Sequence, residues 1–465
     1  MIGVLLTVVA LPNGRGTLFQ GARWNSSAQE VISAVGGSDS GNYLRGGLDV
    51  KDDGKISKEQ NWLVNLWPPG MFYMYGTILY IGGENTLIIA VMLALSIIFW
   101  SVLLSWLYRF IEQRTSRLYA LVSTSTILIF GWPSHGLFSD QLLGSDGISF
   151  ALFLTALLLF FEVDLRKPAQ CAWSGIGIGF LTALAAYLRV SYEFIAIAVS
   201  LGTAILLAVS LGLLLLNQLT KFKRTVPRGL LTVLLFACGV FHLCTTPWRF
   251  VAAENIRPGN YSWSVAGSLY WDYRWTPDSV FENRGVGWLS DGGANSACRL
   301  DKIKCREINL HELRTGAPFQ GGGYSQDEFK SLAFETYSSK PLQLLVDRMG
   351  FLLRSWFGFN LPRTPENLIG QMLSFGAFLI VLSEALLALV TGRITRLSGT
   401  FLVTVTCFLA PFLIMHIEYR YLEPVKFLSI FFFPIAIINL LSFRDKIRKA
   451  QTAEVNPFPE AQQLL

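Results

Sequence analysis

Long apolar stretches recur along this chain and limit what it can fold into. A helix needs about 20 mainly apolar residues to cross the hydrocarbon core of a membrane. Nine stretches approach or reach that length: 84–108, 118–132, 147–163, 174–192, 194–216, 230–247, 368–391, 398–415 and 425–442. Only 15% of the 465 residues are charged, against about 25% in an average soluble protein. The sequence therefore predicts an all-α polytopic membrane protein and excludes a disordered chain, a disulfide scaffold and a nucleic-acid-binding domain.

The N-terminal apolar stretch, residues 1–12, is short for a membrane span. As a helix it would cover only about 18 Å. Either residues near Arg15 complete the span, or the given start omits part of the first helix, and we favour the second explanation. A cleaved signal peptide is less favoured, because no basic residue precedes the apolar run. With this helix the expected number of transmembrane helices is about ten.

Lysine and arginine predict the orientation, because short cytoplasmic loops retain positive charge. Every second connection is basic. The basic groups are Arg109, Arg114 and Arg117; Arg166 and Lys167; Lys221, Lys223, Arg224 and Arg228; Arg393 and Arg396; and Arg444, Lys446, Arg448 and Lys449. We therefore expect both chain ends in the cytoplasm and two long loops with short helices on the outer side.

This layout divides the chain into four parts. Residues 1–247 form an N-terminal membrane bundle that includes a first outer, catalytic loop, 13–83. Residues 248–345 form the second outer loop, 346–442 contain an interfacial helix and the last membrane helices, and 443–465 form a cytoplasmic tail. The interfacial helix is expected within 341–359, where apolar residues alternate with Arg348 and Arg354.

Two patterns in the outer loops allow alternative interpretations. Cys298 and Cys305 would form a disulfide in an oxidising compartment, which we favour over a zinc site with His311 that lacks a fourth ligand. Residues 49–60, DVKDDGKISKEQ, resemble a calcium-binding EF-hand loop, but Lys51 and Gln60 replace two oxygen ligands. We favour a polar turn at Asp53 and Gly54 over a calcium site.

Polar residues cluster at four places that the orientation assigns to the outer side. Ionisable residues at membrane level are expensive to keep and therefore point to function. The clusters are residues 37–44 followed by 67–73; Ser145 and Asp146; residues 187–189 with 246–249; and residues 416–424, HIEYRYLEP. The conservative reading of each alone is a solvated loop acid or an interface anchor. Their convergence on one face favours a single site.

The residue types suit group transfer from a phosphorylated lipid. A carboxylate such as Asp39 can act as general base toward a hydroxyl. The planar guanidinium groups of Arg189, Arg249 and Arg420 suit phosphate oxygens. The donor's tail would lie in the bilayer, and the acceptor would arrive from the aqueous side.

The order of these motifs resembles that of the polytopic GT-C glycosyltransferases, which use polyprenyl- or dolichyl-phosphate sugars and include protein mannosyltransferases and the aminoarabinose transferases of lipid A. The resemblance rests on Asp39 and Tyr43, Pro68 and Pro69, Ser145 and Asp146, Arg189, Pro247 and Trp248 closing the seventh helix, and Glu418, Arg420, Tyr421 and Pro424. It runs through nearly the whole chain, although no single motif is specific.

The resemblance implies a role for each of these residues. Asp39 would be the base or the ligand of a metal, with Mg²⁺ or Mn²⁺ as candidates and the need for a cofactor unknown. Asp146 would be a second acid in the same cavity, and Arg420, with His416 and Tyr421, would hold the donor's phosphate. The family likeness also implies an inverting displacement, with a glycan, lipid or protein as acceptor, and adds Tyr43 and Glu418 to the site. It places the protein in a bacterial inner membrane with its active site on the periplasmic face, or on an equivalent lumenal face.

The sequence departs from the family pattern in two motifs. Ser38 and Ser40 flank Asp39 where many relatives have a second acid, which puts any role for paired acids in doubt. Arg249 directly follows the Pro-Trp pair instead of lying a few residues later. A transporter or flippase of lipid-linked sugars and an O-antigen polymerase or ligase remain alternatives. Transporters usually place polar sites near the midplane, often in repeated halves, and this sequence shows neither.

Overall fold

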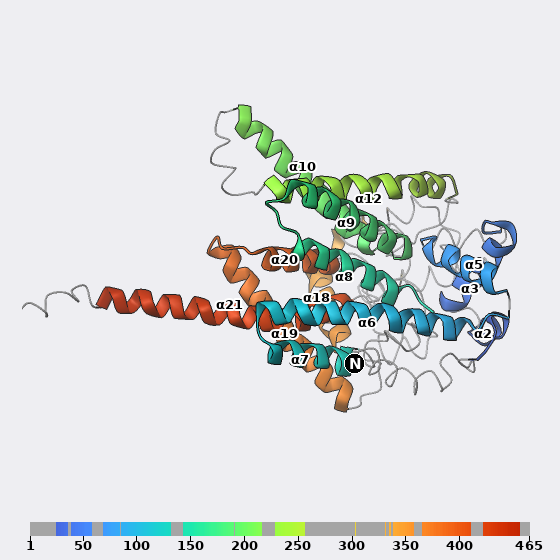
Figure 1. Cartoon of the computed structure of the whole chain (residues 1–465), viewed down its shortest axis with the longest axis horizontal. Coiled ribbons are helices and arrows are strands. Elements are labelled where there is room, and N and C mark those ends of the chain that lie inside the picture. Colours follow the sequence, from blue (N-terminus) through green and yellow to red (C-terminus); the bar gives the residue numbers. More distant parts are fainter. Residues whose placement is uncertain are drawn as a thin grey trace, which may run out of the picture.

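The computed structural model describes most of the predicted apolar stretches of the chain. The described residues are 25–35, 39–57, 68–83, 85–131, 143–189, 191–215, 228–255, 303, 331, 334–335, 338–357, 365–410 and 422–455. Within these ranges the regular structure is helical and no strand occurs (Figure 1). The predicted all-α class is thus confirmed for the part of the chain that the structure describes.

The helices follow one another with short connections where both neighbours are described. In chain order they are α2 (Ala28–Val35), α3 (Asp39–Asp53), α5 (Gly70–Gly82), α6 (Ile88–Arg114), α7 (Arg117–Thr126) with the π-helix η1 (Ile127–Gly131), α8 (Asp146–Glu162), α9 (Pro168–Leu188), α10 (Ser191–Leu215), α12 (Arg228–Asn255), α18 (Pro341–Trp356), α19 (Pro365–Val390), α20 (Arg396–Leu409) and α21 (Glu423–Val455).

Six described helices are long and apolar enough to cross a membrane, namely α6, α9, α10, α12, α19 and α21. The protein is therefore a membrane protein. Three of the nine predicted stretches form shorter helices in the structure: α7, α8 and α20. Residues 1–12 lie outside the described residues.

Local sequence determines where several helices begin. The side chain of Ser116 accepts a hydrogen bond from the Tyr119 amide and caps α7, and Thr395 accepts from the Ser398 amide and caps α20. Such caps satisfy amides that have no partner within the helix. Proline opens α9 at Pro168, where its missing N–H is not needed.

The seventh predicted helix does not end at its proline. We expected Pro247 and Trp248 to close it, but α12 continues to Asn255 with Pro247 in its interior. Two hydroxyl groups donate hydrogen bonds to carbonyls in the turn before the proline. Thr246 Oγ1 donates to the carbonyl of His242 at 2.6 Å, and the Tyr187 hydroxyl donates to that of Cys244 at 2.6 Å. These bonds go to the carbonyls on either side of that of Leu243, which loses its helical donor at Pro247.

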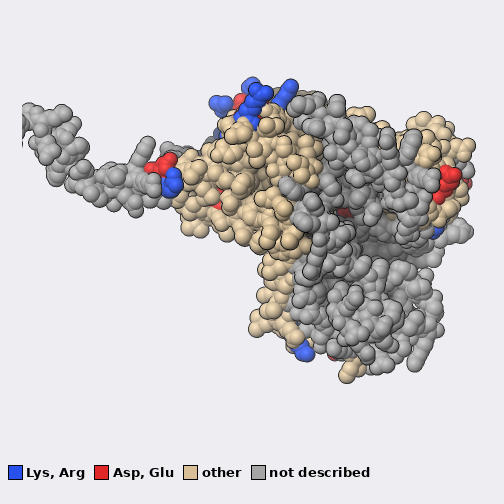
Figure 2. All heavy atoms as spheres, turned by 90° about the horizontal axis from the view of Figure 1, so that it is seen from below, with Lys and Arg blue, Asp and Glu red and all other residues tan. Residues whose placement is uncertain are grey.

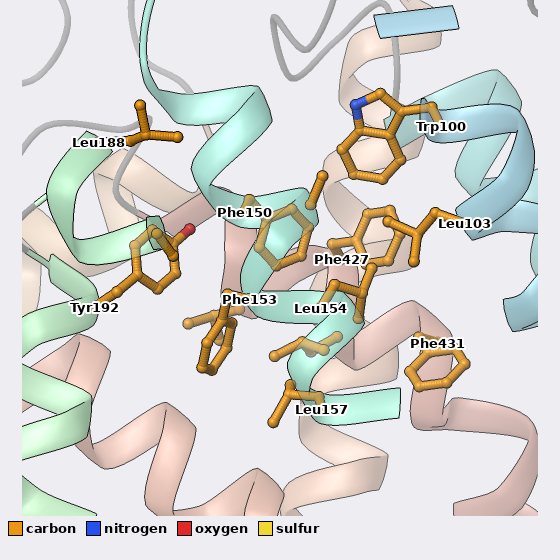
Figure 3. Close-up of a cluster of buried hydrophobic side chains, with 14 of the residues drawn as sticks. Trp100, Leu103, Phe150, Phe153, Leu154, Leu157, Leu188, Tyr192, Phe427 and Phe431 are labelled. Carbon is orange, nitrogen blue, oxygen red and sulfur yellow. The ribbon is translucent and has the colours of Figure 1, made fainter. Parts of the chain in front are cut away.

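Helix α8 lies in the centre of the largest apolar core (Figure 3). The Phe150 ring stands 5.0 Å from that of Phe427 on α21 and 6.2 Å from that of Trp100 on α6. One turn later, Phe153 lies 5.1 Å from Tyr192 on α10. Since aromatic pairs at these separations contribute beyond their buried area, α8 joins three other helices.

The basic connections lie together at one end of this bundle. Arg396 at the start of α20 donates to the carbonyls of Phe160 and Val163 at the end of α8, both at 3.0 Å. Trp106 near the end of α6 donates to Glu162 at 2.6 Å. In Figure 2 the main group of lysine and arginine atoms lies at the top, left of centre. An acidic group lies at the far right, which is the end where α2, α3 and α5 lie in Figure 1. We name the two ends the Arg396 end and the Asp146 end.

Helices α9 and α12 approach each other through glycine. A Cβ atom at Gly175 would lie 2.7 Å from the carbonyl oxygen of Val233 and 2.8 Å from Phe236 Cβ. At Gly177, on another face of α9, a Cβ atom would meet only Leu159 Cδ1 at an ordinary 3.6 Å. Small residues at membrane-helix interfaces permit this close packing.

We predict that Gly175→Ala destabilises the protein relative to Gly177→Ala. Both changes add the same methyl group to one helix, so their effects on helix propensity cancel. At residue 175 the helices must separate, which costs about 1–3 kcal/mol. Thermal unfolding in detergent should show a lower melting temperature for Gly175→Ala, and equal melting temperatures would contradict the tight crossing.

Candidate functional site

Two helices from the first predicted outer loop, α3 and α5, run side by side in the same direction. The Tyr43 ring lies 5.5 Å from that of Phe72. Further along both helices, Gly47 faces Gly76, where a Cβ atom on Gly47 would lie 3.3 Å from the Gly76 nitrogen. The starts of the two helices, at Asp39 and Gly70, therefore lie at the same end of the pair.

The start of α5 lies against the end of α9. A Cβ atom at Gly70 would be 2.6 Å from the carbonyl oxygen of Tyr187 and 2.9 Å from Leu188 Cδ2. Only glycine allows this approach without a shift of one backbone. Arg189 follows directly as the C-terminal cap of α9, so the α3–α5 pair begins beside that arginine.

Arg189 and Asp146 form an ion pair at this place. Arg189 Nη1 lies 2.7 Å from Asp146 Oδ1 and 3.4 Å from Ser145 Oγ. Both side chains are mostly covered, with 15% and 18% of their surface exposed. Asp146 lies in the first turn of α8 and Arg189 at the end of α9, so each charge is stabilised by the dipole of its own helix.

Tyr75 of α5 fixes the turn that precedes Asp146. Its hydroxyl donates to the carbonyl of Leu143 at 2.6 Å. Burial raises the pKa of Tyr75 well above its usual value, and the neighbouring Tyr43 raises that pKa further. Tyr75 therefore stays protonated and remains a donor, and it connects the first-loop helices to the start of α8.

The structure thus brings together several residues that the sequence placed in one site. The described parts of that site are the backbone start of α3 at Asp39, the Asp146–Arg189 ion pair and the α5 start. Tyr43 is only 2% exposed and packs on Phe72. Its ring fills the α3–α5 interface.

Other predicted site residues are not placed at this pair by the structure. The backbone of Arg249 lies in α12. The remaining predicted residues lie outside the described residues: His416, Glu418, Arg420, Tyr421, Cys298 and Cys305. Among the described residues, no three His, Cys, Asp or Glu side chains are grouped so that they could hold a metal ion.

The calcium-loop resemblance corresponds to a turn in the structure. Helix α3 ends at Asp53, and Gly54 follows with a φ of 70°, a conformation that glycine adopts readily. Asp49 Oδ2 accepts a hydrogen bond from the Ser57 amide at 3.0 Å. The first residues of the segment, Asp49 to Asp53, are thus helical, and the bend at Gly54 agrees with the polar turn expected at Asp53 and Gly54.

A second charged group at the Asp146 end was not predicted. Lys426, in the first turn of α21, is fully buried, and its Nζ lies 3.3 Å from Glu423 Oε1. The same Nζ lies 5.9 Å from the centre of the Trp356 ring of α18. Trp356 Nε1 in turn donates to Ser374 Oγ of α19 at 3.2 Å. The available signal was a lysine inside the predicted span 425–442.

The two charged groups belong to neighbouring helix starts. Phe150 lies one turn after Asp146, Phe427 lies one turn after Glu423, and their rings are 5.0 Å apart. The first turns of α8 and α21 are therefore adjacent. This end of the bundle offers mostly buried carboxylates and cations, and buried charges interact more strongly than charges in water.

Comparisons with known proteins identify no relative for this chain. No family model matches the sequence, and neither a curated protein nor a solved structure is similar to it.

We predict strong coupling between Asp146 and Arg189. In a double-mutant cycle with Asp146→Ala and Arg189→Ala, the coupling free energy should be about 0.5–3 kcal/mol, the range for residues in direct contact. The exposed pair Asp164 and Arg166, 3.1 Å apart with Arg166 91% exposed, is the matched control and should show no measurable coupling. Additive effects of the Asp146 and Arg189 substitutions on unfolding in detergent would contradict the buried pair.

Proposed function

We propose that this protein is an integral-membrane glycosyltransferase that moves a sugar from a polyprenyl-phosphate donor to a hydroxyl acceptor. In this proposal about ten helices span the membrane, both chain ends are cytoplasmic, and the Asp146 end faces the outer side of a bacterial plasma membrane. The gathering of the basic connections at the Arg396 end supports that orientation, because basic loops stay in the cytoplasm.

One observation carries the proposal: the Asp146–Arg189 ion pair lies beside the start of the α3–α5 pair. These parts come from three separate regions of the chain, and each region contributes a motif in the order that resembles the GT-C glycosyltransferases. A structural role for the ion pair alone would not need the start of α3, with its acidic residue, at the same end.

The proposed reaction is a single displacement. The acceptor oxygen attacks the anomeric carbon, the bond between that carbon and the phosphate oxygen breaks, and the lipid phosphate leaves with the bonding electrons. Asp39 takes the proton of the acceptor hydroxyl as general base. Attack opposite the leaving group inverts the configuration of the sugar.

In this proposal the cations bind the phosphate of the donor and stabilise its charge. Arg420, with His416, Tyr421 and Glu418 in the same motif, binds the donor's phosphate and stabilises the negative charge that grows on it during bond breaking. Arg189 is held in place by Asp146, and Arg249 lies further along the chain, in α12. Preorganised charges of this type stabilise a transition state without reorganising.

We predict that Asp39→Asn abolishes sugar transfer while the protein still folds. The amide cannot accept the acceptor's proton, so the rate should fall by at least about a hundredfold. Transfer from a radiolabelled polyprenyl-phosphate sugar to added acceptors in membranes measures this. Asp52→Asn is the control, because Asp52 lies on the same helix with a side chain 60% exposed, and it should keep full activity.

Normal transfer by Asp39→Asn would refute the assigned base. Movement of the labelled lipid across the membrane without a new glycosidic bond would instead favour the transporter alternative.

We predict that Arg420→Ala raises the KM for the lipid-phosphate donor at least about tenfold, since a lost charge-assisted bond weakens binding by that order. The KM for the acceptor should change much less. Steady-state kinetics with each substrate varied in turn separates the two effects. Equal effects on both substrates would contradict the phosphate role.

A further inference from the structure

The start of α12 packs directly on the connection between α8 and α9. A Cβ atom at Gly229 would overlap the carbonyl oxygen of Leu165 and lie 2.7 Å from the carbonyl carbon of that residue. Only glycine fits at this contact without a shift of one backbone. The two backbones therefore touch, and the residues next to Gly229 and Leu165 in the sequence lie close together.

Three basic residues flank this contact. Arg228 directly precedes Gly229, and Arg166 and Lys167 directly follow Leu165. Because two residues of chain span at most about 7 Å, all three basic side chains begin within that distance of the contact. Each of the three is exposed. The contact thus gathers cations from two separate parts of the sequence into one surface group at the Arg396 end.

Asp164 offsets part of this positive charge by pairing with Arg166. Its Oδ1 accepts from the Arg166 amide and from Arg166 Nε, both at 3.1 Å. These bonds lower the pKa of Asp164, and the charges of Arg166 and Lys167 lower it further, so Asp164 is ionised at neutral pH. Among the residues that the structure describes, no carboxylate forms an ion pair with Lys167 or Arg228. Three cations and one carboxylate leave this group with a net charge of +2.

Lys167 and Arg228 lie where membrane spans begin. The apolar spans of α9 and α12 start at Pro168 and Arg228, and Lys167 directly precedes the first of them. Residues at the ends of such spans lie at the level of the lipid headgroups. Seven residues further along the same face of α12, Leu235 is 42% exposed. The surface that leads from Arg228 into the bilayer therefore carries an exposed apolar side chain about 10 Å away.

We propose that this basic group binds the headgroup of an anionic phospholipid. The phosphate oxygens accept hydrogen bonds from Lys167 Nζ and from the Arg228 guanidinium, and an acyl chain lies along α12 past Leu235. We name the group the Lys167–Arg228 site. It includes none of the residues assigned to sugar transfer and does not depend on the proposed function.

The position of the Lys167–Arg228 site favours a lipid over a soluble anion. A lipid brings its phosphate to the depth of these cations together with chains that cover the apolar face. Free phosphate would gain only the charge interaction, which salt screens at an exposed site. Basic residues on this side also set the orientation of the protein. Orientation depends on how many charges the connections carry, whereas lipid binding depends on where they lie, so substitutions at different places on this side separate the two roles.

Lipid binding by the purified full-length protein tests the proposal. Native mass spectrometry and thermal unfolding in detergent compare phosphatidylglycerol with phosphatidylcholine of the same acyl chains, and with inorganic phosphate. We expect phosphatidylglycerol to bind most tightly and to raise the melting temperature. Its binding should weaken as salt rises from about 0.1 M to about 1 M, where the screening length falls to about 3 Å. Equal binding of phosphatidylcholine, equal protection by inorganic phosphate, or binding that salt does not change would overturn the proposal.

Three substitutions at exposed positions, each of which removes one positive charge, test the residues. Lys167→Gln and Arg228→Gln should each lower the affinity for phosphatidylglycerol about fivefold, the effect of one basic residue near a membrane surface. Arg444→Gln is the matched control, because Arg444 lies at the same end of the bundle but pairs with Asp445 at 3.6 Å. It should bind the lipid as the parent protein does. Unchanged affinity in Lys167→Gln or Arg228→Gln, or an equal loss in Arg444→Gln, would overturn the proposal.

Discussion

The packing of α8 on α21 determines how the rest of the bundle is arranged. Phe150 and Phe427 meet edge to face with ring centres 5.0 Å apart, and Trp100 of α6 lies within 6.2 Å of both. Each phenylalanine lies one turn after the acidic residue that begins its helix. An apolar contact therefore brings two charged helix starts to the same end, and α9 and α10, which pack around α8, add Arg189 and Tyr192 beside them.

Much of the fold could be predicted because its cause is local. Apolar length alone identified the six long helices, and alternating basic connections indicated which helix ends lie together. The association of Asp146 with Arg189 follows from the same reasoning, since each residue lies at a helix end on the same side. The structure adds the geometry, a direct ion pair at 2.7 Å, together with the packing role of Tyr43.

Other features depend on contacts between distant segments and could not be read locally. A lysine near the end of a span usually extends toward water, whereas Lys426 is fully buried with the Trp356 ring 5.9 Å from its Nζ. Arg348 was expected on the polar side of an interfacial helix, and it is fully buried. Pro247 suggested a helix end, but α12 continues through it to Asn255. The burial of Lys426 and Arg348 depends on packing between segments that are distant in sequence, which a local pattern does not show.

The cation of the candidate site already has a partner. Arg189 lies beside Asp146, so a phosphate that approaches Arg189 must share or replace an existing partner. The binding free energy then contains only the difference between the cation–phosphate and the cation–carboxylate interaction. This difference keeps the affinity moderate while the site still selects anions. On the proposed reaction this has a use, because the lipid product also carries a phosphate and has to leave. A cation without a carboxylate beside it would hold donor and product alike, and release would limit turnover.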